Sequence, residues 1–223
     1  MTKMYHHLPV AAYTSQDWFD REQEQIFSRT WRFAGLLEDV PEPGHYISVQ
    51  AGLNNIFIVM GGDGKLRAFH NICRHRGAQL IRAVGSAEKH RLTCPYHDWT
   101  YDLEGNLIAV PEQTTEFPGG VDKKCLGLKP ASVGIWRGMM FVHPDPDAPS
   151  LEDWFGPVDP LLGPHKPEVL VEYTDARHSY EIKANWKIVV ENYIDVYHLR
   201  HLHSKTLYIC LLYTSPSPRD IGE

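Results

Sequence analysis

Two short stretches in the first half of the chain combine cysteine and histidine at close spacing. Cys73 and His75 form a C-x-H pair in "CRHRG", and Cys94 and His97 form a C-x-x-H pair in "CPYH", with eighteen residues between the two pairs. Thiolate and imidazole are ligands that zinc and iron both accept in proteins. Two such pairs, each beside a Gly or Pro that favours a turn, rarely occur together by chance. The pattern therefore predicts one metal centre that two loops build together.

Three kinds of metal centre compete for these four residues. A structural zinc ion takes four Cys or His ligands in a tetrahedron, and this set could supply them. An iron–sulfur cluster with four cysteine ligands is excluded, because the motifs contain only two cysteines. A [2Fe-2S] cluster with two Cys on one iron and two His on the other matches both the ligand count and the spacing.

A second group of metal-binding side chains lies in "ENYIDVYHLRHLH", residues 191–203, which contains Asp195, His198, His201 and His203. Two histidines and one carboxylate are the ligand set of mononuclear non-haem iron. Residues five apart lie about 140° apart around a regular helix. Either the helix ends or widens between His198 and His203, or His201 is the partner of His198. The alternative interpretation is a solvent-facing helix end that happens to be rich in histidine.

The first pair of motifs lies in a region with the texture of a small antiparallel β domain. Short runs rich in β-branched and aromatic residues alternate there with Gly and Pro: "HYISVQ", "NIFIVM", "KLRAFH", "RLTC", "DWTYD", "NLIAV" and "SVGIWRGMMFVHP". "MGGDGK" reads as a hairpin turn. The preceding "TSQDWFDREQEQIFSRTW" predicts a helix, with Thr14 as N-cap and Asp17 three residues on.

The second group lies beyond a linker, "HPDPDAPS", in what we expect to be another domain. "LEDWFGPVDPLL" predicts a short helix, "EVLVEYTDARHSYEIK" a long strand or a bent pair, and "ANWKIVVENYIDVYHLRHLH" a second helix. The chain is thus expected to be an α+β protein. Residues 1–36 form a helical segment, 37–150 the β domain, and 151–209 the first part of the second domain.

The last segment, residues 210–223, continues no earlier pattern. "CLLYTSPSPRD" resembles the translated read-through of a sequencing-library adapter, so we expect this tail to be non-native. The alternative is a genuine Ser/Pro-rich tail.

The composition excludes several classes of function. The chain has 223 residues, 43% of them hydrophobic and 22% charged, with a net charge of -6 and no basic stripe, so no nucleic-acid partner is expected. Its apolar runs are too short to span a membrane, and no signal peptide is visible. Four cysteines are too few for a disulfide scaffold, which favours the cytoplasm.

The residues around these motifs carry a family resemblance over residues 5–209. "CRHRGAQL" and "CPYHDWTYDLEGNL" resemble the two cluster-binding loops of Rieske proteins, although the gap between them is about one residue longer than usual. "ENYIDVYHLRHLH" resembles the mononuclear-iron motif of Rieske non-haem iron oxygenases, the ring-hydroxylating α subunits. It has two residues between Asn and Asp, where some aromatic dioxygenases have three.

The resemblance implies roles for individual residues. Cys73, His75, Cys94 and His97 would hold a [2Fe-2S] cluster of the oxygenase or ferredoxin type.

For the mononuclear iron the resemblance implies two ligands, His198 and His203, and no role for His201. Asp195 would be a bridge for the electron, hydrogen-bonded to a ligand histidine of each centre. Asn192 would support the site from one helical turn earlier. The third ligand would be a carboxylate beyond this chain, within a helix-grip fold, so the chain alone is expected to bind its cluster without turning over.

The implied function is oxygenation. Electrons from NAD(P)H would arrive through a reductase or ferredoxin, and O₂ and Fe(II) would hydroxylate a small organic substrate, either an aromatic compound or a quaternary amine. A homotrimer is implied, because electrons in this family usually cross between subunits. The alternatives are a Rieske ferredoxin-like electron-transfer protein, in which His198 and His203 have no role, and a zinc-binding module.

Overall fold

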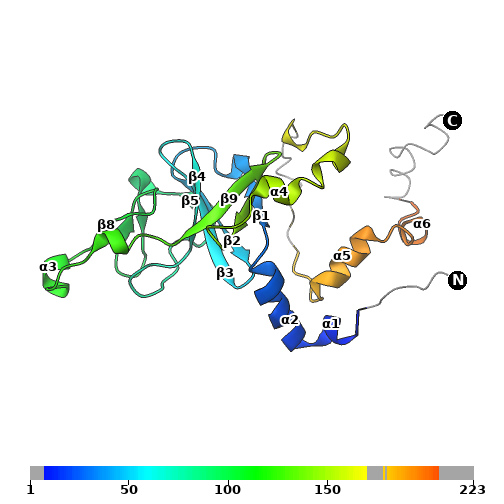
Figure 1. The fold of residues 1–223 in the computed structure, drawn as a ribbon, viewed down its shortest axis with the longest axis horizontal. Coiled ribbons are helices and arrows are strands. Elements are labelled where there is room, and N and C mark those ends of the chain that lie inside the picture. Colours follow the sequence, from blue (N-terminus) through cyan, green and yellow to red (C-terminus); the bar gives the residue numbers. More distant parts are fainter. Residues whose placement is uncertain (1–7, 170–177, 179, 206–223) are drawn as a thin grey trace. The chain divides into compact units, whose positions relative to one another are not determined.

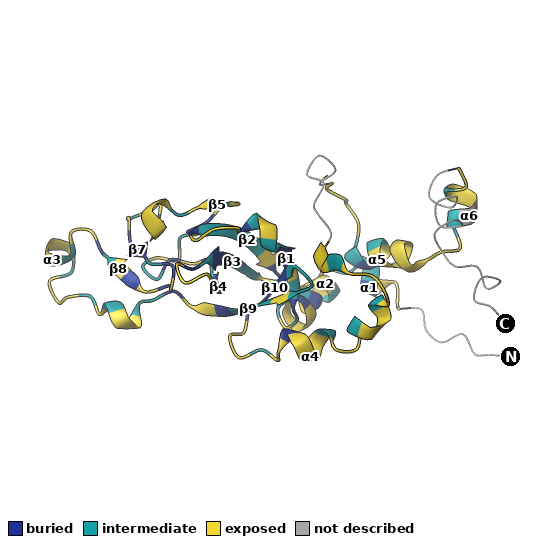
Figure 2. Cartoon of the chain, turned by 90° about the horizontal axis from the view of Figure 1, so that it is seen from above, coloured by how far each residue is buried: buried dark blue, intermediate teal, exposed yellow. Residues whose placement is uncertain are grey.

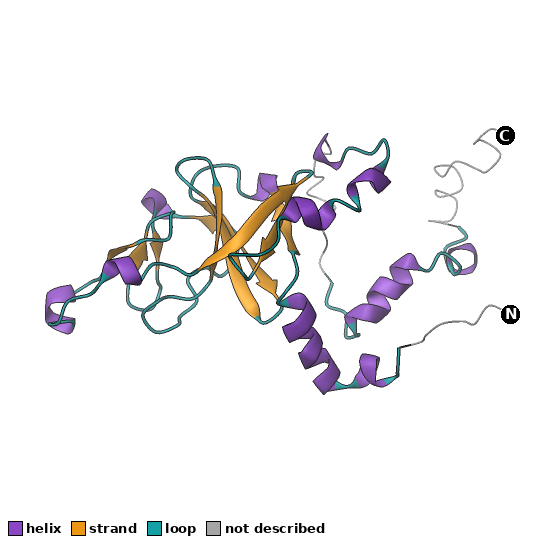
Figure 3. Cartoon of the chain, viewed as in Figure 1, coloured by secondary structure: helices purple, strands orange, loops and turns teal. Residues whose placement is uncertain are grey.

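The computed structural model describes residues 8–169, 178 and 180–205. The chain divides into two compact units, residues 20–174 and a second unit made of residues 1–19 and 175–223. Within the described part of the chain, no helix is long and apolar enough to cross a membrane. Antiparallel sheets combined with short helices confirm the predicted α+β class (Figure 3).

The larger unit is built on a seven-stranded sheet in the order β1-β10-β9-β4-β3-β2-β5 (Figure 1). Every neighbouring pair is antiparallel. The strands are β1 Arg32–Leu36, β2 His45–Ala51, β3 Asn54–Met60, β4 Leu66–His70, β5 Gly85–Ser86, β9 Pro130–Trp136 and β10 Met139–His143. Strands β2, β3, β4, β9 and β10 coincide with β-rich runs in the sequence, whereas β1 was not predicted. The "MGGDGK" stretch forms the β3–β4 hairpin turn as predicted.

The same unit also contains a second sheet of three short strands, β6 Leu92–Thr93, β7 Thr100–Tyr101 and β8 Leu107–Ala109. Short helical turns connect the strands: η2 Leu37–Asp39, η3 Glu88–His90, α3 Gln113–Glu116 and η4 Lys123–Cys125. The β6–β7 connection is the segment that contains Cys94 and His97.

Strand β3 has buried side chains on both faces of the large sheet, as expected for a central strand. Its residues 56–59 are fully buried (Figure 2). Phe57 and Val59 pack in a core shared with the small sheet, whereas Ile56 and Ile58 pack in a second core with residues of β10. The first core contains Cys73 and Cys94, so the cysteine motifs begin inside the hydrophobic interior.

After β10 the chain continues on the same unit. Helix α4, Leu151–Phe155, is capped by the Ser150 hydroxyl, which accepts the Asp153 N–H, and it is followed by η5 Asp159–Leu162 and η6 Pro167–Val169. A Cβ added at Gly134 of β9 would lie 2.7 Å from Leu151 Cδ2, so the absence of a side chain there lets α4 approach the sheet.

The compact unit is therefore wider than the range 37–150 predicted for the β domain. Strand β1 pairs with β10, although the predicted boundary assigns residues 32–36 to the helical segment, and α4 also belongs to this unit. The domain boundaries drawn from sequence remain predictions.

The smaller unit contains α1 Ala11–Thr14, α5 Trp186–Ile194 and α6 Leu199–Leu202. Asn185 caps α5 by accepting the Lys187 N–H, and its side-chain amide donates to the carbonyls of Ala12 and Tyr13. The Tyr13 hydroxyl donates to Glu191 at 2.5 Å. The strand predicted for 168–183 lies mostly outside the described residues, and so does the 210–223 tail.

The helix predicted near the N-terminus is present, but its start differs. Helix α2 runs from Gln16 to Glu22 and continues as a π-helical turn, η1 Gln23–Phe27. Thr14 is not its N-cap: Thr14 ends α1 and its hydroxyl bonds the Val10 carbonyl, whereas the Ser15 hydroxyl accepts the Trp18 N–H. Both residues can cap, and the geometry places Ser15 at the position where the cap is needed.

Candidate metal centres

The two Cys–His motifs form loops with the same backbone hydrogen bonds. In the first loop the Cys73 N–H donates to Ala78 O and the Gly77 N–H donates to Cys73 O, at 2.8 and 3.0 Å. In the second loop Cys94 and Trp99, and Asp98 and Cys94, make the equivalent bonds at 2.9 and 3.0 Å.

The residue four positions after each cysteine has a positive φ, +72° at Gly77 and +54° at Asp98. Asp tolerates this left-handed conformation better than most residues, because its short polar side chain can bond locally. Two sequences of different composition thus build equivalent ligand loops.

These loops bring all four predicted ligands of the cluster into one region. The cysteines are buried, with Cys73 2% and Cys94 1% exposed. The His75 and His97 rings lie 4.7 Å apart between centroids. His75 also stacks on the buried Trp99 at 4.8 Å and 6°, which fixes the plane of its ring.

The arrangement fits a cluster held by two pairs of ligands. Among buried side-chain nitrogen and oxygen atoms of the described residues, only His97 Nδ1 and Arg74 Nε lack a hydrogen-bond partner. A buried imidazole nitrogen without a partner is costly unless it binds a metal. Within the described ranges, no three or more His, Cys, Asp or Glu side chains gather as one mononuclear site. A thiol pair beside an imidazole pair suits two bridged irons better than one tetrahedral zinc ion.

The pKa shifts of Cys73 and His75 agree with a role as metal ligands. Burial raises the pKa of the Cys73 thiol, and the neighbouring Cys94 thiol adds to the effect, so a nearby cation is needed to keep the thiolates charged. Desolvation lowers the pKa of His75, and His97 and Arg76 lower it further. The imidazole is therefore neutral near pH 7, which is the form that binds a metal.

Tyr101, a residue that the sequence motifs did not single out, contacts the first ligand loop from β7. Its hydroxyl lies 3.4 Å from Cys73 Sγ and accepts the Arg74 N–H at 3.0 Å. Burial, and then the contact with Cys73, raises the pKa of Tyr101, so the phenol stays protonated and can donate to the sulfur. In the sequence, "DWTY" places Trp99 and Tyr101 two positions apart and so on one side of a strand, but nothing in it selects Cys73 as the partner of Tyr101.

We expect Tyr101→Phe to lower the reduction potential of the bound cluster by tens of millivolts, because hydrogen bonds to the sulfurs stabilise the reduced state. Redox titration monitored by EPR measures this shift. Thr93→Val, on the neighbouring strand, removes a hydroxyl that pairs with Thr100 and not with a cysteine, and should leave the potential unchanged. An unaltered potential in the Tyr101 variant would contradict the assignment.

A cavity of about 410 Å³ opens beside the two histidines. It is lined by His75, Arg76, His97, Asp98, Trp99, Pro111, Glu112, Glu116 and Phe117. The exposed Tyr96 lies against His97, with ring centroids 3.8 Å apart. The histidine side of the centre is thus reached from the surface, whereas the cysteine side lies in the core.

The second candidate centre depends on a break in the helix. Helix α5 ends at Ile194, Asp195 is extended with ψ 104°, and α6 begins only at Leu199. His198 directly precedes α6 and His203 directly follows it, and their rings lie 5.5 Å apart at 69°. The break removes the 140° separation of a continuous helix.

The neighbouring residues of this pair differ in their contacts. Asp195 Oδ2 lies 3.2 Å from His198 Nδ1, which leaves Nε2 available for a metal. Two hydrogen bonds lower the pKa of Asp195: the larger effect comes from the Tyr197 N–H and the smaller from the His198 side chain. Asn192 and His201 are both exposed, and His201 contacts the Tyr197 ring instead. The described residues supply two imidazoles here, whereas a facial triad needs a carboxylate ligand as well.

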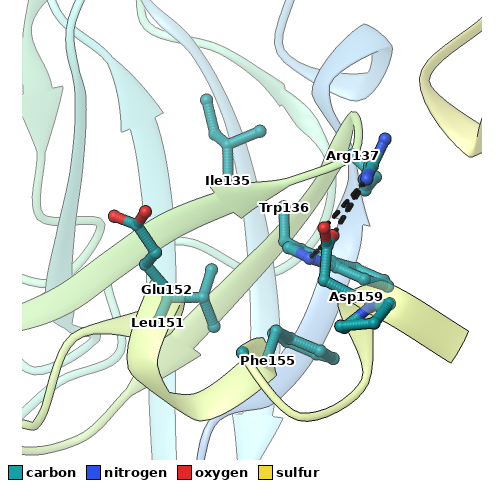
Figure 4. Close-up of a pocket in the computed structure, with 9 residues that line it drawn as sticks. Ile135, Trp136, Arg137, Leu151, Glu152, Phe155 and Asp159 are labelled. Atoms are coloured by element: carbon teal, nitrogen blue, oxygen red, sulfur yellow. Dashed lines mark hydrogen bonds and ion pairs between the residues drawn. The ribbon is translucent and has the colours of Figure 1, made fainter.

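Another cavity, of about 540 Å³, lies between the β9–β10 hairpin and α4 (Figure 4). Asp159 accepts hydrogen bonds from Trp136 Nε1 and from the Arg137 guanidinium, at 3.0 to 3.2 Å, and Trp136 stacks on Phe155 at 4.2 Å. These contacts fix the segment after β10 to the sheet. Trp136 therefore anchors this segment by packing.

Comparison with known proteins gives two family matches. Residues 30–126 match the Rieske [2Fe-2S] domain, and residues 172–214 match the catalytic domain of the ring hydroxylating alpha subunit. The second match includes residues 210–214 of the segment predicted to be non-native.

Individual relatives agree with these matches. The oxygenase subunit of glycine betaine monooxygenase from Chromohalobacter salexigens is 34% identical, over 97% of this chain and 49% of the relative. The large oxygenase component of the naphthalene 1,2-dioxygenase system from Pseudomonas aeruginosa is 36% identical, over 86% of this chain and 43% of the relative. The apo structure of a quaternary ammonium Rieske monooxygenase superimposes with a TM-score of 0.78 at 34% identity, over 89% of this chain and 57% of that chain. The chain spans about half the length of the curated relatives it matches.

Proposed function

Because the chain belongs to the α subunits of Rieske non-haem iron oxygenases, with a Rieske domain and a segment of the catalytic domain, we propose that the protein is the oxygenase component of such a system. In this role it receives electrons from a reductase or ferredoxin and hydroxylates a small organic substrate with O₂. When bound, the [2Fe-2S] cluster stores single electrons and the mononuclear iron activates O₂.

The observation that carries the proposal is the matched pair of ligand loops. Cys73 and Cys94 would hold one iron within the core, and His75 and His97 would hold the other beside the surface cavity. The unpartnered Nδ1 of His97 supports a metal at that position. Because the thiolates are buried and the imidazoles lie beside the surface cavity, electrons would be exchanged through the histidine side of the cluster.

In the second centre, His198 and His203 would be iron ligands and Asp195 would orient His198 through its Nδ1 atom. This supports the role of Asp195 as the bridge between the two centres. Asn192 would stabilise the site from α5. A further carboxylate would complete the facial triad.

The proposed substrate is defined by its chemical class. Relatives of similar identity act on glycine betaine, carnitine, naphthalene and anthranilate. We propose a quaternary amine or an aromatic compound as the substrate, and substrate-dependent O₂ uptake with both classes would decide between them.

The proposed partners follow from the same chemistry. An NAD(P)H-linked reductase or a ferredoxin would donate the electrons, and three copies of the chain would form a homotrimer in the cytoplasm. One solved relative is described in terms of inter-subunit electron transfer, which supports the assembly proposed here.

Replacement of both His198 and His203 by alanine tests the oxygenase function, in a chain that extends over the full length of its relatives. We expect substrate hydroxylation to fall below detection, because no imidazole remains to hold the iron, while reduction of the cluster by the donor is retained. The control is His201→Ala, which replaces an exposed histidine of α6 between His198 and His203 and should keep full activity. Hydroxylation by the double variant would instead favour the electron-transfer alternative.

A further inference from the structure

We infer that Asn71 is a positioning residue for the cluster: its buried side-chain amide closes the loop that carries Cys73 and His75 and fixes this loop to the large sheet. The inference rests on the proposed function, in which these two residues are cluster ligands. Asn71 follows directly after β4 and is 2% exposed, which is rare for an amide side chain.

The Asn71 side chain closes the loop by hydrogen bonds to its far end. Asn71 Oδ1 accepts the N–H groups of Leu80 and Ile81 at 3.0 and 2.9 Å, and Nδ2 donates to the Ile81 carbonyl at 2.6 Å. One side chain at the start of the loop thus satisfies three backbone groups at its end. Cys73 and His75 lie between the two ends.

Asn71 also attaches the loop to the large sheet. The other hydrogen of Nδ2 points to Asn55 Oδ1 at 2.6 Å, and the Asn71 N–H donates to the Asn55 carbonyl at 2.9 Å. Asn55 belongs to β3, and its side-chain oxygen also accepts the hydroxyl of Ser48 on β2 at 3.1 Å. The loop is therefore tied to β3, whose Asn55 is bonded in turn to β2, as well as to itself.

Retention of the cluster depends on how firmly the first ligand loop is held. The inner bond between Cys73 and Ala78 shapes the ligand turn, but it does not fix that turn relative to Cys94 and His97 on the other loop. Ligand pairs on separate loops bind together only if both loops are held within a fraction of an ångström. All hydrogen-bonding atoms of the Asn71 amide are used, so a substitution leaves buried backbone groups of the loop unpaired.

The test compares Asn71→Ala and Asn71→Asp in the cluster-loaded chain. Outer partners of metal ligands typically change affinity about 10- to 100-fold, so we expect Asn71→Ala to release iron to a chelator faster by about that factor. We also expect it to broaden the Rieske-type EPR signal. Asn71→Asp keeps the oxygen that accepts the Leu80 and Ile81 N–H groups. Its rate of iron release should therefore lie between those of the parent and of Asn71→Ala, and its EPR signal should stay close to that of the parent.

Two controls separate positioning from general stability. Gln79→Ala removes a donor to the same Ile81 carbonyl from an exposed side chain, and should retain its iron as the parent does. Val142→Ala creates a cavity in the other core, remote from the loop, and should lower the unfolding midpoint without faster iron loss below that midpoint. Equal iron-release rates for Asn71→Ala and Val142→Ala at matched stability, or parent-like release in Asn71→Ala, would overturn the inference. A parent chain that never acquires iron and sulfide would instead contradict the proposed function.

Discussion

Replacing Cys94 with serine is expected to abolish the cluster, reducing iron and acid-labile sulfide from about two of each per chain to a small fraction of that. Cys94 is 1% exposed and lies in the core beside Cys73. A serine hydroxyl stays protonated near pH 7, and no alternative thiol lies within the ligand loops. The protein should therefore lose its visible absorption and its EPR signal on reduction.

Cys125→Ser provides the matched control for this experiment. Cys125 is exposed, and its thiol contacts the Asp122 carboxylate, away from the ligand loops. The control should keep the metal and sulfide content of the parent chain. Zinc in place of iron in the parent chain, or a full cluster in the Cys94 variant, would contradict the ligand assignment.

Local spacing was sufficient to predict that the two Cys–His motifs form turns, and it predicted most of the strands. The backbone bonds of each loop join residues no more than five positions apart, so the information lies within "CRHRGA" and "CPYHDW". The unbroken run of β-branched and aromatic residues in "NIFIVM" likewise predicts β3, because a strand with both faces buried needs apolar residues at successive positions. Thr14 was mistaken for a cap because two adjacent residues can both cap a helix, and only the backbone geometry distinguishes them.

The mononuclear-iron motif shows where periodicity fails. A helical pattern extends from Trp186 through the histidines, yet the helix breaks after Ile194 and begins again at Leu199. No Gly or Pro marks this break. The Asp195 side chain accepts the Tyr197 N–H at 2.8 Å and so offers the backbone an alternative to the helix. The resemblance of the motif indicated His203, whereas helical spacing alone favoured His201.

Residues that act across long sequence distances could not be predicted. Asn71 bonds Asn55 and Ile81, and Tyr101 contacts Cys73, over separations of 10 to 28 residues. A lone Asn or Tyr in a β-rich run has many possible partners, and the sequence contains no spacing rule that selects one. Only the assembled sheets bring these side chains to the ligand loops.

The second large effect is expected at Gly105, in the hairpin between β7 and β8. Its φ is +86°, and a Cβ added there would lie 2.4 Å from the Phe69 ring, which is buried in the core that holds both cysteines. Neither partner can move easily. Gly105 O accepts the Leu128 N–H at 2.7 Å, and Phe69 packs on Phe57 with ring centroids 5.6 Å apart.

We therefore expect Gly105→Ala to lower the free energy of unfolding by about 3 kcal/mol, combining roughly 1 kcal/mol for the left-handed backbone with roughly 2 for overpacking. Urea unfolding followed by tryptophan fluorescence measures this change. Gly64→Ala isolates the first contribution, because Gly64 has a φ of +73° but no atom within 4 Å of the added Cβ. If the two variants were equally destabilised, Phe69 would have moved aside at no cost, and the core that contains Cys73 and Cys94 would be far more adaptable than its packing indicates.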